Sequence, residues 1–419
     1  MFVITIVGYS QIMEENFEAG FPTEVVKEGE VRVLVPKLEA FVKSPSDYAP
    51  SKAPVFYNPV MELNRDVAVL ALQAYQRMVD RELSVCEPLA GCGVRGIRFA
   101  KEVVGVEKVV VNDINGKAVQ LAKHNVELNG LGGKVVVQNL DANFLLGGYA
   151  APRKRFDAID IDPFGPPVPY LDSAIRALRN GGLLALTATD LASLCGVYPK
   201  ACIRKYGGKP LRTEYCHELA VRLLAGCLAV AAAKHDIAVK IVFCHSTDHY
   251  IRVYATTEYG AKKADESLKN MGYIMHCFKC FHREPVKTLS FFDVSAKCRE
   301  CGAKMDFAGP LWIGKLFDKE FCRLMEEELG KRSFRLKRRI EKLLGLIKNE
   351  AEAPITYYTV DKLCDALNLQ VPSVKKVLSI LKRSGYSAFL THFNPKGVKS
   401  NVSATKMREI LRKIVDGNQ

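Results

Sequence analysis

Residues 160–165 (DIDPFG) follow an apolar, β-rich run, at the kind of strand end where open α/β sheets bind ligands. Asp162 could accept a hydrogen bond from an exocyclic amine, favour a tetrahedral nitrogen, and carry or relay the proton that is released. Pro163 fixes the backbone so that a carbonyl can accept a hydrogen bond from the second amine hydrogen. Phe164 offers a face on which a flipped-out base can stack. The segment alone is equally consistent with a simple strand-ending turn.

A glycine-rich loop precedes this segment and lies between a predicted strand and a predicted helix. Gly91, Gly93 and Gly96 have the spacing found where the chain turns tightly and a ligand approaches the backbone. Asp113 follows about 20 residues later, where an acidic side chain can accept hydrogen bonds from both hydroxyls of an adenosine ribose. This arrangement suits NAD as well as S-adenosylmethionine, so by itself it predicts only a nucleoside cofactor.

A second carboxylate could serve the adenine of such a cofactor. Asp141 follows the third β-rich run, where it could hold the adenine amino group, and Ala142 would supply a neighbouring backbone donor. Asp141 taken alone is at least as consistent with a helix N-cap or a turn residue.

Two Cys-x-x-Cys pairs have the spacing of a four-thiolate zinc site in which each pair closes a small knuckle. The four residues are Cys277, Cys280, Cys298 and Cys301. Four cysteines around a tetrahedral zinc leave no open position, so we predict a structural metal, with a loosely held metal or free thiols as alternatives. His276 and His282 flank the first pair and could substitute as ligands, although four cysteines make them unnecessary. The other cysteines are scattered singly and are interpreted as small core residues.

The elements that must position these residues alternate between β-rich and helical runs from about residue 84 to residue 235, which is typical of a parallel sheet with crossover helices. The predicted strands are 84–87, 108–112, 134–138, 156–161 and 183–188, and the predicted helices are 116–128, 170–178 and 214–234. Two further strands, 238–244 and 250–256, are too close for a parallel crossover and should be antiparallel. We therefore expect an α/β protein whose Rossmann-like sheet, with its antiparallel last strand, resembles the class I methyltransferase fold.

The pattern changes near residue 260. This change divides the chain into a predicted N-terminal region and methyltransferase domain (1–260) and a smaller α+β domain with the zinc site (261–419). Beyond a short linker that ends at Pro354, the runs 360–368, 371–386 and 387–393 predict helix, helix and strand, a winged-helix-like order.

Most of the positive charge lies at the C-terminal end. Of the net charge of +14, a balance of +12 comes from residue 331 onward, where 19 Lys and Arg stand against 7 Asp and Glu. The run 331–339 (KRSFRLKRR) predicts cations on several faces of a helix with few acids to neutralise them, which suits phosphate contact. Lys396 and Lys399, in an apparent loop, could also touch a nucleic-acid backbone. A solvated charged surface is the alternative.

The thirteen cysteines do not indicate secretion, because the opening MFVITIVGYSQI has no basic region and only a short apolar run. No stretch approaches the roughly 20 apolar residues of a membrane span. We expect a reducing, cytoplasmic location without a membrane, in which the cysteines do not form disulfides. An acidic, polar segment follows the opening run, and our hypothesis is that Met13 is the true start.

Together these motifs resemble the tRNA (guanine-N2)-dimethyltransferase (Trm1) family, of the archaeal type. The resemblance covers about residues 28–400 and rests on FYNP at 56–59, NRD at 64–66, the glycine loop, DPFG at 162–165, TATD at 187–190, the stretch 199–206 and the cysteine pairs. It implies that the guanine at tRNA position 26, at the hinge between the D and anticodon stems, is converted to N2-methyl- and then N2,N2-dimethylguanosine. It also implies S-adenosylmethionine as cofactor and tRNA as partner, with no protein partner required for catalysis.

The resemblance assigns roles to individual residues. It implies that Asp162 is the catalytic carboxylate and that Phe56 and Phe164 are aromatic walls around the target base. It implies that Arg65 and Arg95 contact the cofactor, with at least one charge near its methionine carboxylate. It also implies that the adenosine is contacted by Asp113, Asp141 and Ala142. Arg65 could equally pair with Asp66 or Glu62 on a surface helix. Pro166 departs from the small hydroxyl residue that the family often has after the glycine, at the rim of the pocket.

Three other functions compete with this one. A DNA or protein amine methyltransferase would use the same Asp-Pro-aromatic chemistry, but the basic tail suits shape and phosphate recognition better than major-groove reading. A non-catalytic RNA-binding or zinc-stabilised scaffold would have no need of both Asp162 and Asp113. The predicted antiparallel strand pair counts against an NAD dehydrogenase.

Overall fold

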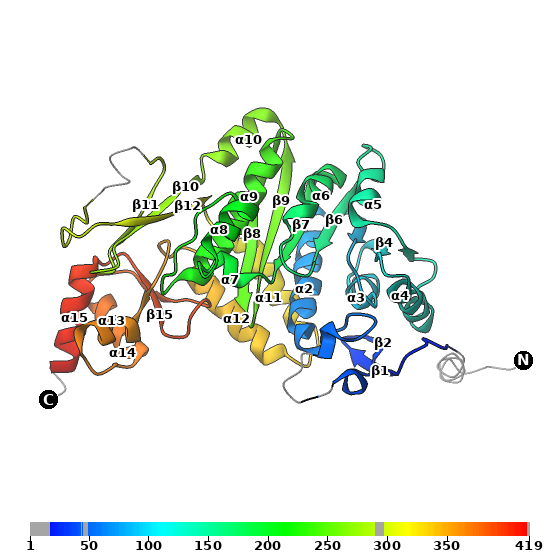
Figure 1. Cartoon of the computed structure of the whole chain (residues 1–419), viewed down its shortest axis with the longest axis horizontal. Helices are drawn as coiled ribbons and strands as arrows, with labels where there is room; N and C mark the ends of the chain where they lie inside the picture. The colour runs from blue at the N-terminus through cyan, green and yellow to red at the C-terminus, as the bar shows by residue number, and fades with distance from the viewer. Residues whose placement is uncertain (1–16, 43, 45–48, 290–296, 417–419) are drawn as a thin grey trace, which may run out of the picture. The chain divides into compact units, whose positions relative to one another are not determined.

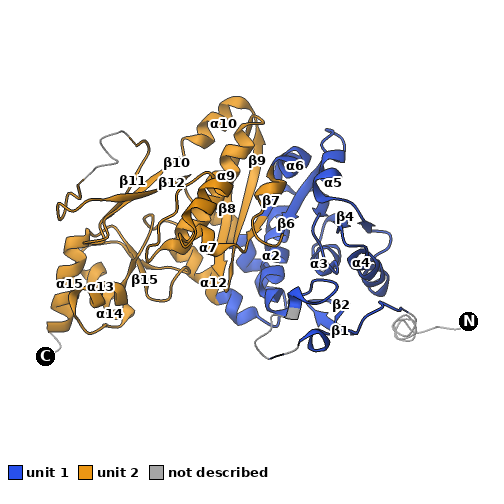
Figure 2. Cartoon of the chain, in the orientation of Figure 1, with its two compact units in different colours: residues 1–162, 172–185, 323–341 blue, residues 163–171, 186–322, 342–419 orange. Residues whose placement is uncertain are grey.

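The structure is a computed structural model that describes residues 17–42, 44, 49–289 and 297–416 (Figure 1). The hypothesis about Met13 therefore lies outside the described residues. The chain divides into two compact units (Figure 2), of which the first consists of residues 1–162, 172–185 and 323–341 and the second of residues 163–171, 186–322 and 342–419. Residue 260, where we expected a domain boundary, is not a point at which the chain passes between these units.

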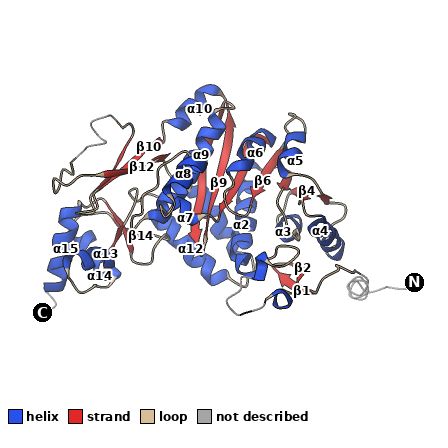
Figure 3. Ribbon diagram, in the orientation of Figure 1, coloured by secondary structure: helices blue, strands red, loops and turns tan. Residues whose placement is uncertain are grey.

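Seven strands form one mixed sheet (Figure 3). From edge to edge they are β5 (Val135–Gln138), β4 (Val106–Asn112), β3 (Leu83–Glu87), β6 (Phe156–Ile161), β7 (Leu178–Ala188), β9 (Tyr250–Tyr259) and β8 (Ile237–Thr247). β3 is parallel to β4 and to β6, β4 is parallel to β5, and β8 and β9 pair antiparallel. The predicted mixed α/β sheet with its antiparallel pair is thus confirmed.

The strands of this sheet that belong to the first unit form where valine is abundant, because branched side chains favour extended backbone and pack well on a covered sheet. Its crossover helices are α3 (Val94–Glu102), α4 (Gly116–Leu128), α5 (Ala142–Gly148) and α6 (Leu171–Ala177). Asn115 caps α4 by accepting a hydrogen bond from the Lys117 amide at 3.0 Å. The preceding α2 (Glu62–Val79) is buried from Glu62 to Tyr75, so it is a core helix and not the surface helix that we considered.

An N-terminal hairpin, β1 (Thr23–Glu28) and β2 (Val31–Pro36), is fastened to α4 by two asparagines. Asn125 Oδ1 accepts from the Leu34 amide at 2.6 Å, and Asn129 Oδ1 accepts from the Arg32 amide at 3.1 Å. The hairpin thereby brings Glu28, which is 2% exposed, into the interior of the first unit.

The second unit contains α9 (Cys216–Ala233), which packs on β8 and β9. Around it lie α7 (Leu191–Leu194), α8 (Pro199–Tyr206), α10 (Ala261–Leu268) and a small sheet in the order β11 (Arg283–Val286), β10 (Met271–His276) and β12 (Asp306–Trp312). Among the helices of the described residues, only α9 is long and apolar enough to cross a membrane by length and composition, and 72% of it is buried within the protein. We therefore interpret α9 as a core helix, whose two charged residues, Glu218 and Arg222, pair with each other at 2.8 Å.

The chain ends in the predicted winged-helix-like arrangement (Figure 1). Its elements are β13 (Tyr358–Thr359), α13 (Val360–Leu367), α14 (Val374–Arg383), β14 (Ala388–Leu390), β15 (Gly397–Ser400) and α15 (Ala404–Asp416). The strands pair in the order β13-β15-β14, and residues such as Leu363, Val377, Leu381 and Leu411 close a hydrophobic core against them.

Two expectations for the basic region are wrong. The run 331–339 does not form one helix, because α11 (Lys319–Gly330) ends before it and α12 (Lys337–Glu350) begins within it. Lys399 lies in β15 and not in a loop, and its side chain is only 3% exposed. Its ammonium is 2.7 Å from Glu218 and 3.7 Å from Glu350, both of which are also buried. Lys399 therefore serves a buried ion cluster and cannot contact phosphate.

Candidate active site

Asp162 lies directly after β6 and is held by a buried arginine. The guanidinium of Arg95 forms an ion pair with Asp162, and its Nη1 donates to Asp160 Oδ1 at 2.6 Å. Its Nη2 also donates to Asn64 Oδ1 at 3.2 Å. The side chain of Arg95 is 3% exposed and that of Asp162 is 16% exposed, so a buried cation fixes a carboxylate that still reaches the surface.

Arg95 stands at this position because it is the second residue of α3, which opens directly from the glycine loop. Glu87, at the end of β3, accepts from the Gly96 amide at 2.8 Å and lies 3.9 Å from Arg95 Nε. Burial raises the pKa of Glu87 to about 8, against the opposing influence of Arg95. A side chain at Gly96 would come within 2.4 Å of Val111, so only glycine permits this close packing of helix and strand.

The glycine loop and Asp113, which the sequence identified separately, lie together. Gly91 donates its amide to Asp113 Oδ2 at 2.8 Å, and Asp113 Oδ1 accepts from the Asn115 amide at the same distance. Gly91 has a φ of +55°, and a Cβ there would lie 2.8 Å from the carbonyl oxygen of Phe56. The loop is therefore closely packed and can present backbone groups and a carboxylate to a nucleoside.

Asp141 is the N-cap of α5, which was one of the two interpretations open from the sequence. Its Oδ1 accepts from the amides of Asn143 at 2.9 Å and Phe144 at 3.0 Å. Ala142 begins the helix and is buried. The contacts of Asp141 and Ala142 with an adenine stay predictions.

Arg65 pairs with a residue that the sequence analysis missed. Its Nε and Nη2 donate to the two carboxylate oxygens of Glu28, each at 2.6 Å. Asp66 pairs instead with Arg98 at 2.7 Å, and Glu62 pairs with Arg335, so both expected partners of Arg65 are wrong. Sequence reasoning had no means of finding Glu28, because it lies in β1, 37 residues before Arg65.

Arg65 also holds the segment that covers the glycine loop. Its Nη2 donates to the backbone carbonyl of Asn58 at 3.1 Å, and the Asn58 side chain accepts from the Val60 amide at 3.0 Å. Phe56, in the same segment, is half-buried.

Phe164 is 72% exposed and stands two residues after Asp162 in the chain. The turn that carries it is clamped by Thr189, whose Oγ1 accepts from the Gly165 amide at 2.8 Å and whose amide donates to the Gly165 carbonyl at 3.1 Å. Thr187 in turn accepts from the fully buried Arg252 at 2.6 Å. An exposed ring on a fixed turn is suited to stacking a base, and Arg252 is a supporting residue that the sequence analysis missed.

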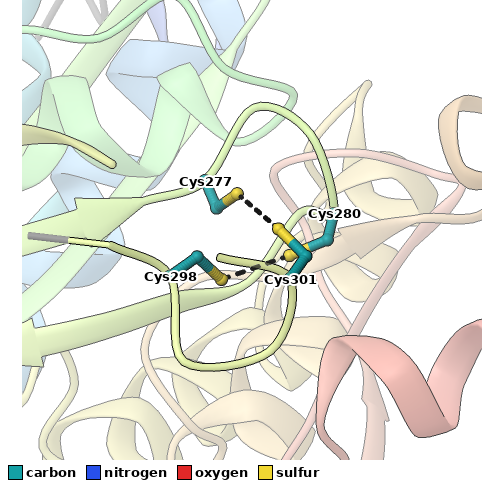
Figure 4. Close-up of side chains that lie close together, drawn as sticks. All are labelled: Cys277, Cys280, Cys298 and Cys301. Carbon is teal, nitrogen blue, oxygen red and sulfur yellow. Dashed lines mark hydrogen bonds between the residues drawn. The ribbon is translucent and has the colours of Figure 1, made fainter. Parts of the chain in front are cut away.

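The two cysteine pairs converge as their spacing predicts (Figure 4). The Sγ atoms of Cys277 and Cys301 are 3.5 Å apart, those of Cys280 and Cys298 are 3.4 Å apart, and all four lie within 4.8 Å of one another. His276 and His282 do not belong to this group. His276 Nδ1 bonds the Tyr215 hydroxyl at 2.9 Å, and His282 Nδ1 lies 2.7 Å from Glu300.

The expectation that the basic run has few neutralising acids is wrong for part of it. Lys331 pairs with Glu328 at 2.7 Å, and Arg335 pairs with Glu62. Arg338 and Arg339 are exposed. They line a hollow of about 640 Å³ together with Phe334, Arg335, Leu336, Lys337 and Glu341. The exposed arginines that line this hollow thus lie at the start of α12.

Comparisons with known proteins agree with this geometry. Residues 29–412 match the family described as N2,N2-dimethylguanosine tRNA methyltransferase. The chain is 42% identical over 398 residues to the tRNA (guanine(26)-N(2))-dimethyltransferase of Methanobrevibacter smithii. The matched region covers 95% of this chain and 99% of that relative. It is 37% identical over 398 residues to the tRNA (guanine(26)-N(2)/guanine(27)-N(2))-dimethyltransferase of Aquifex aeolicus, with 93% and 95% covered.

A solved structure is similar over nearly the whole chain. Trm1 from Pyrococcus horikoshii, in complex with S-adenosyl-L-methionine, superposes with a TM-score of 0.80 at 35% sequence identity. The superposed region covers 93% of this chain and 99% of that structure's chain. The chain belongs to the N2,N2-dimethylguanosine tRNA methyltransferase family.

Proposed function

We propose that this chain transfers methyl groups from S-adenosylmethionine to the exocyclic N2 of guanine 26 in tRNA, giving N2-methyl- and then N2,N2-dimethylguanosine. The observation that carries the proposal is the position of Asp162. It follows β6 directly, is oriented by Arg95 at the start of α3, and stands two residues before the exposed Phe164. A carboxylate, a nucleoside-binding loop and an aromatic face are the parts that this reaction needs.

The guanine amine is a poor nucleophile, because its lone pair is delocalised into the ring. S-adenosylmethionine supplies, when bound, an electrophilic methyl group on a cationic sulfur. Asp162 accepts a hydrogen bond from the amine. As the new N–C bond forms and the methyl–sulfur bond breaks, which would leave the cofactor as a neutral thioether, Asp162 takes the proton that the amine loses and passes it to solvent. Arg95 keeps the carboxylate in one orientation, and Phe164 holds the flipped-out base. Asp162 must release the first proton before it can serve the second methylation.

The glycine loop fits the cofactor. The backbone at Gly91 and Gly93 can approach a ligand closely, and the Asp113 carboxylate, with about four acceptor positions, can accept from the ribose in addition to Gly91 and Asn115. Asp141 caps α5 through Oδ1, so its second oxygen can accept from the adenine amine. In this proposal Arg65 is a positioning residue that acts through Asn58, and Arg95 is the arginine that faces the reacting groups.

The four-cysteine cluster would hold one structural zinc ion. Its sulfurs are close enough to ligate a single tetrahedral ion. The first cysteine pair lies between β10 and β11, and the second pair precedes β12, so the ion would hold the ends of the small sheet together. The expected result of zinc analysis is a tightly held ion, whose removal by a chelator lowers the melting temperature. A chelator-treated protein that has lost its zinc but melts at the same temperature would contradict this role.

Phosphate contact would come from the cationic hollow at the start of α12. The substitution Arg338→Ala should weaken tRNA binding and reduce the slope of log affinity against log salt by roughly 1. Lys331→Ala is the matched control, because Lys331 is already paired with Glu328, and it should leave the slope nearly unchanged. Unchanged salt dependence in the Arg338→Ala variant would exclude this residue as a tRNA contact. A tRNA substrate also fits the expected cytoplasmic location.

The function is tested by incubating the purified chain with an unmodified tRNA transcript and methyl-labelled S-adenosylmethionine, followed by nucleoside analysis. We expect label in N2-methyl- and N2,N2-dimethylguanosine, and none when adenine replaces guanine 26. A transcript with adenine at position 27 shows whether this chain also modifies the neighbouring guanine, as the name of the Aquifex aeolicus relative indicates for that enzyme. If label persists when adenine replaces guanine 26 but disappears when adenine stands at position 27, the modified residue is guanine 27 and not guanine 26. Measurable cofactor binding without any labelled tRNA would refute the proposed substrate.

A further inference from the structure

Cys195, Cys216 and His217 form a second cluster of metal-binding side chains. One ligand atom of each, two thiol sulfurs and one imidazole nitrogen, lies within 4.8 Å of the other two. The interpretation of the remaining cysteines as singly scattered core residues is therefore wrong for this pair. No spacing motif identifies the cluster, because Cys195 and Cys216 come from separate segments that only the fold brings together.

The backbone explains how these segments meet. Cys195 is the C-cap of α7, with its amide donating to the Leu191 carbonyl at 2.7 Å, and Cys216 and His217 are the first two residues of α9. Gly196 follows with a φ of +87°, and a Cβ there would lie 2.8 Å from the backbone nitrogen of Arg212. Glycine at this position lets the turn after α7 pack directly on the segment that leads into α9.

The ligand set has a clear metal preference. Two thiolates and one imidazole suit zinc and other thiophilic divalent ions, whereas magnesium and calcium prefer oxygen ligands. With bonds of about 2.0–2.3 Å, the ligands of a tetrahedral zinc are roughly 3.5–3.8 Å apart, within the spread seen here. Cys216 and His217 are half-buried, and a water molecule would take the fourth position.

We propose that Cys195, Cys216 and His217 hold a second zinc ion, separate from the four-cysteine site. The ion ties the turn after α7 to the start of α9. Tyr215, just before Cys216, bonds His276, which itself precedes Cys277, so a single tyrosine–histidine contact joins the two metal sites.

The second ion would also support the base-binding turn, a consequence that rests on the proposed function. Thr189 and Asp190 lie just before α7, at the other end of this short helix from Cys195. Asp190 accepts from the Tyr206 hydroxyl at 2.5 Å, and Thr189 clamps Gly165. Loss of the ion loosens this segment and with it the exposed Phe164. The residues of the cluster are thus positioning residues for methyl transfer.

The test is the zinc content of the purified full chain, measured by elemental mass spectrometry after growth with added zinc and extensive dialysis. We expect about two zinc ions per chain in the wild type and about one in Cys195→Ala/Cys216→Ala and in Cys277→Ala/Cys280→Ala. Cys86→Ala/Cys364→Ala, which removes two buried cysteines that belong to neither group, is the matched control and should keep about two. One ion in the wild type that survives in Cys195→Ala/Cys216→Ala would overturn the proposal.

X-ray absorption of the wild type keeps the proposal testable if a variant does not fold. Two occupied sites give an average of roughly three sulfur neighbours per zinc, whereas the four-cysteine site alone gives about four. An average of four, or a disulfide between Cys195 and Cys216 in the purified protein, refutes the second site. Absence of methyl transfer by the wild type would refute the proposed function and leave the zinc count as the measure of the metal site.

Discussion

Replacing Arg95 by methionine removes the cation between three carboxyl groups while keeping most of the volume of the side chain. The side chains of Glu87 and Asp160 are each 4% exposed, and that of Asp162 is 16% exposed, so water cannot fully replace the lost guanidinium. Removing one partner of a buried ion pair costs about 3–5 kcal/mol of folding stability. Without the guanidinium, the Asp162 carboxylate also loses the group that orients it.

The expected kinetic result is a fall of about 100-fold in single-turnover methyl transfer at neutral pH, because Asp162 is less well oriented toward the amine. Arg95→Lys keeps the charge but cannot bridge both aspartates, so its loss of rate should be smaller.

The matched control is Arg98→Met. Arg98 is fully buried and pairs with Glu28, Asp66 and Glu102, so its loss should destabilise the fold by a similar amount. Its three ion-pair partners are residues other than Asp162, so the folded protein should keep a rate near that of the wild type. The assay is single-turnover transfer of labelled methyl groups to tRNA at neutral pH, with chemical denaturation alongside. An Arg95→Met protein with a rate within about twofold of the wild type would refute the assigned role of Arg95.

Three further outcomes follow from the same site. Asp162→Ala should abolish methyl transfer yet bind S-adenosylmethionine with nearly unchanged affinity in calorimetry; turnover by this variant would exclude the carboxylate mechanism. Gly91→Ala should weaken cofactor binding more than tenfold, because its Cβ would lie 2.8 Å from the Phe56 carbonyl at a positive φ, whereas Gly130→Ala, also at positive φ but with nothing within 4 Å, should bind normally. Equal affinities of the two glycine variants would show that the loop does not shape the site. Burial raises the pKa of Glu87 to about 8, so the folded state holds its proton more tightly than the unfolded state and stability should fall as pH rises from about 5 to 8. Glu87→Gln should reduce that fall by roughly 2–3 kcal/mol between pH 6 and 9 in urea denaturation, and parallel pH curves for the two proteins would contradict it.

The strands of the sheet and the antiparallel pairing of the last two were predictable because their determinants are local. Valine-rich runs, glycine turns and the short connection between β8 and β9 each act within a few residues. The placement of Asp162 after β6 follows from the same kind of local pattern, and the convergence of the cysteine pairs was predicted from the spacing within each pair. The order of the parallel strands was not predicted, because neighbours such as β3 and β6 come from distant parts of the chain.

The charged interior was not predictable, because its pairs are made by topology. Asp162 finds Arg95 across 67 residues, and Arg65 finds Glu28 across 37. In the sequence nothing marks Glu28 as the partner of Arg65 or Arg95 as the partner of Asp162, and Lys399 looks like a loop cation. Only the depth of each side chain decides whether it meets solvent or a buried partner, and depth depends on how strands and helices stack.

The ion pair between Lys399 and Glu218 has a consequence for engineering and for evolution. Burial alone would raise the pKa of Glu218, but Lys399 and Arg222 lower it to about 2, so this carboxylate is charged at every physiological pH. A chain truncated before the winged-helix-like part would leave that charge in α9 without one of its two cations. The tail is therefore not a cassette that can be cut away or grafted onto another enzyme without a compensating change in α9. Lineages that exchanged it would be expected to have altered both positions together.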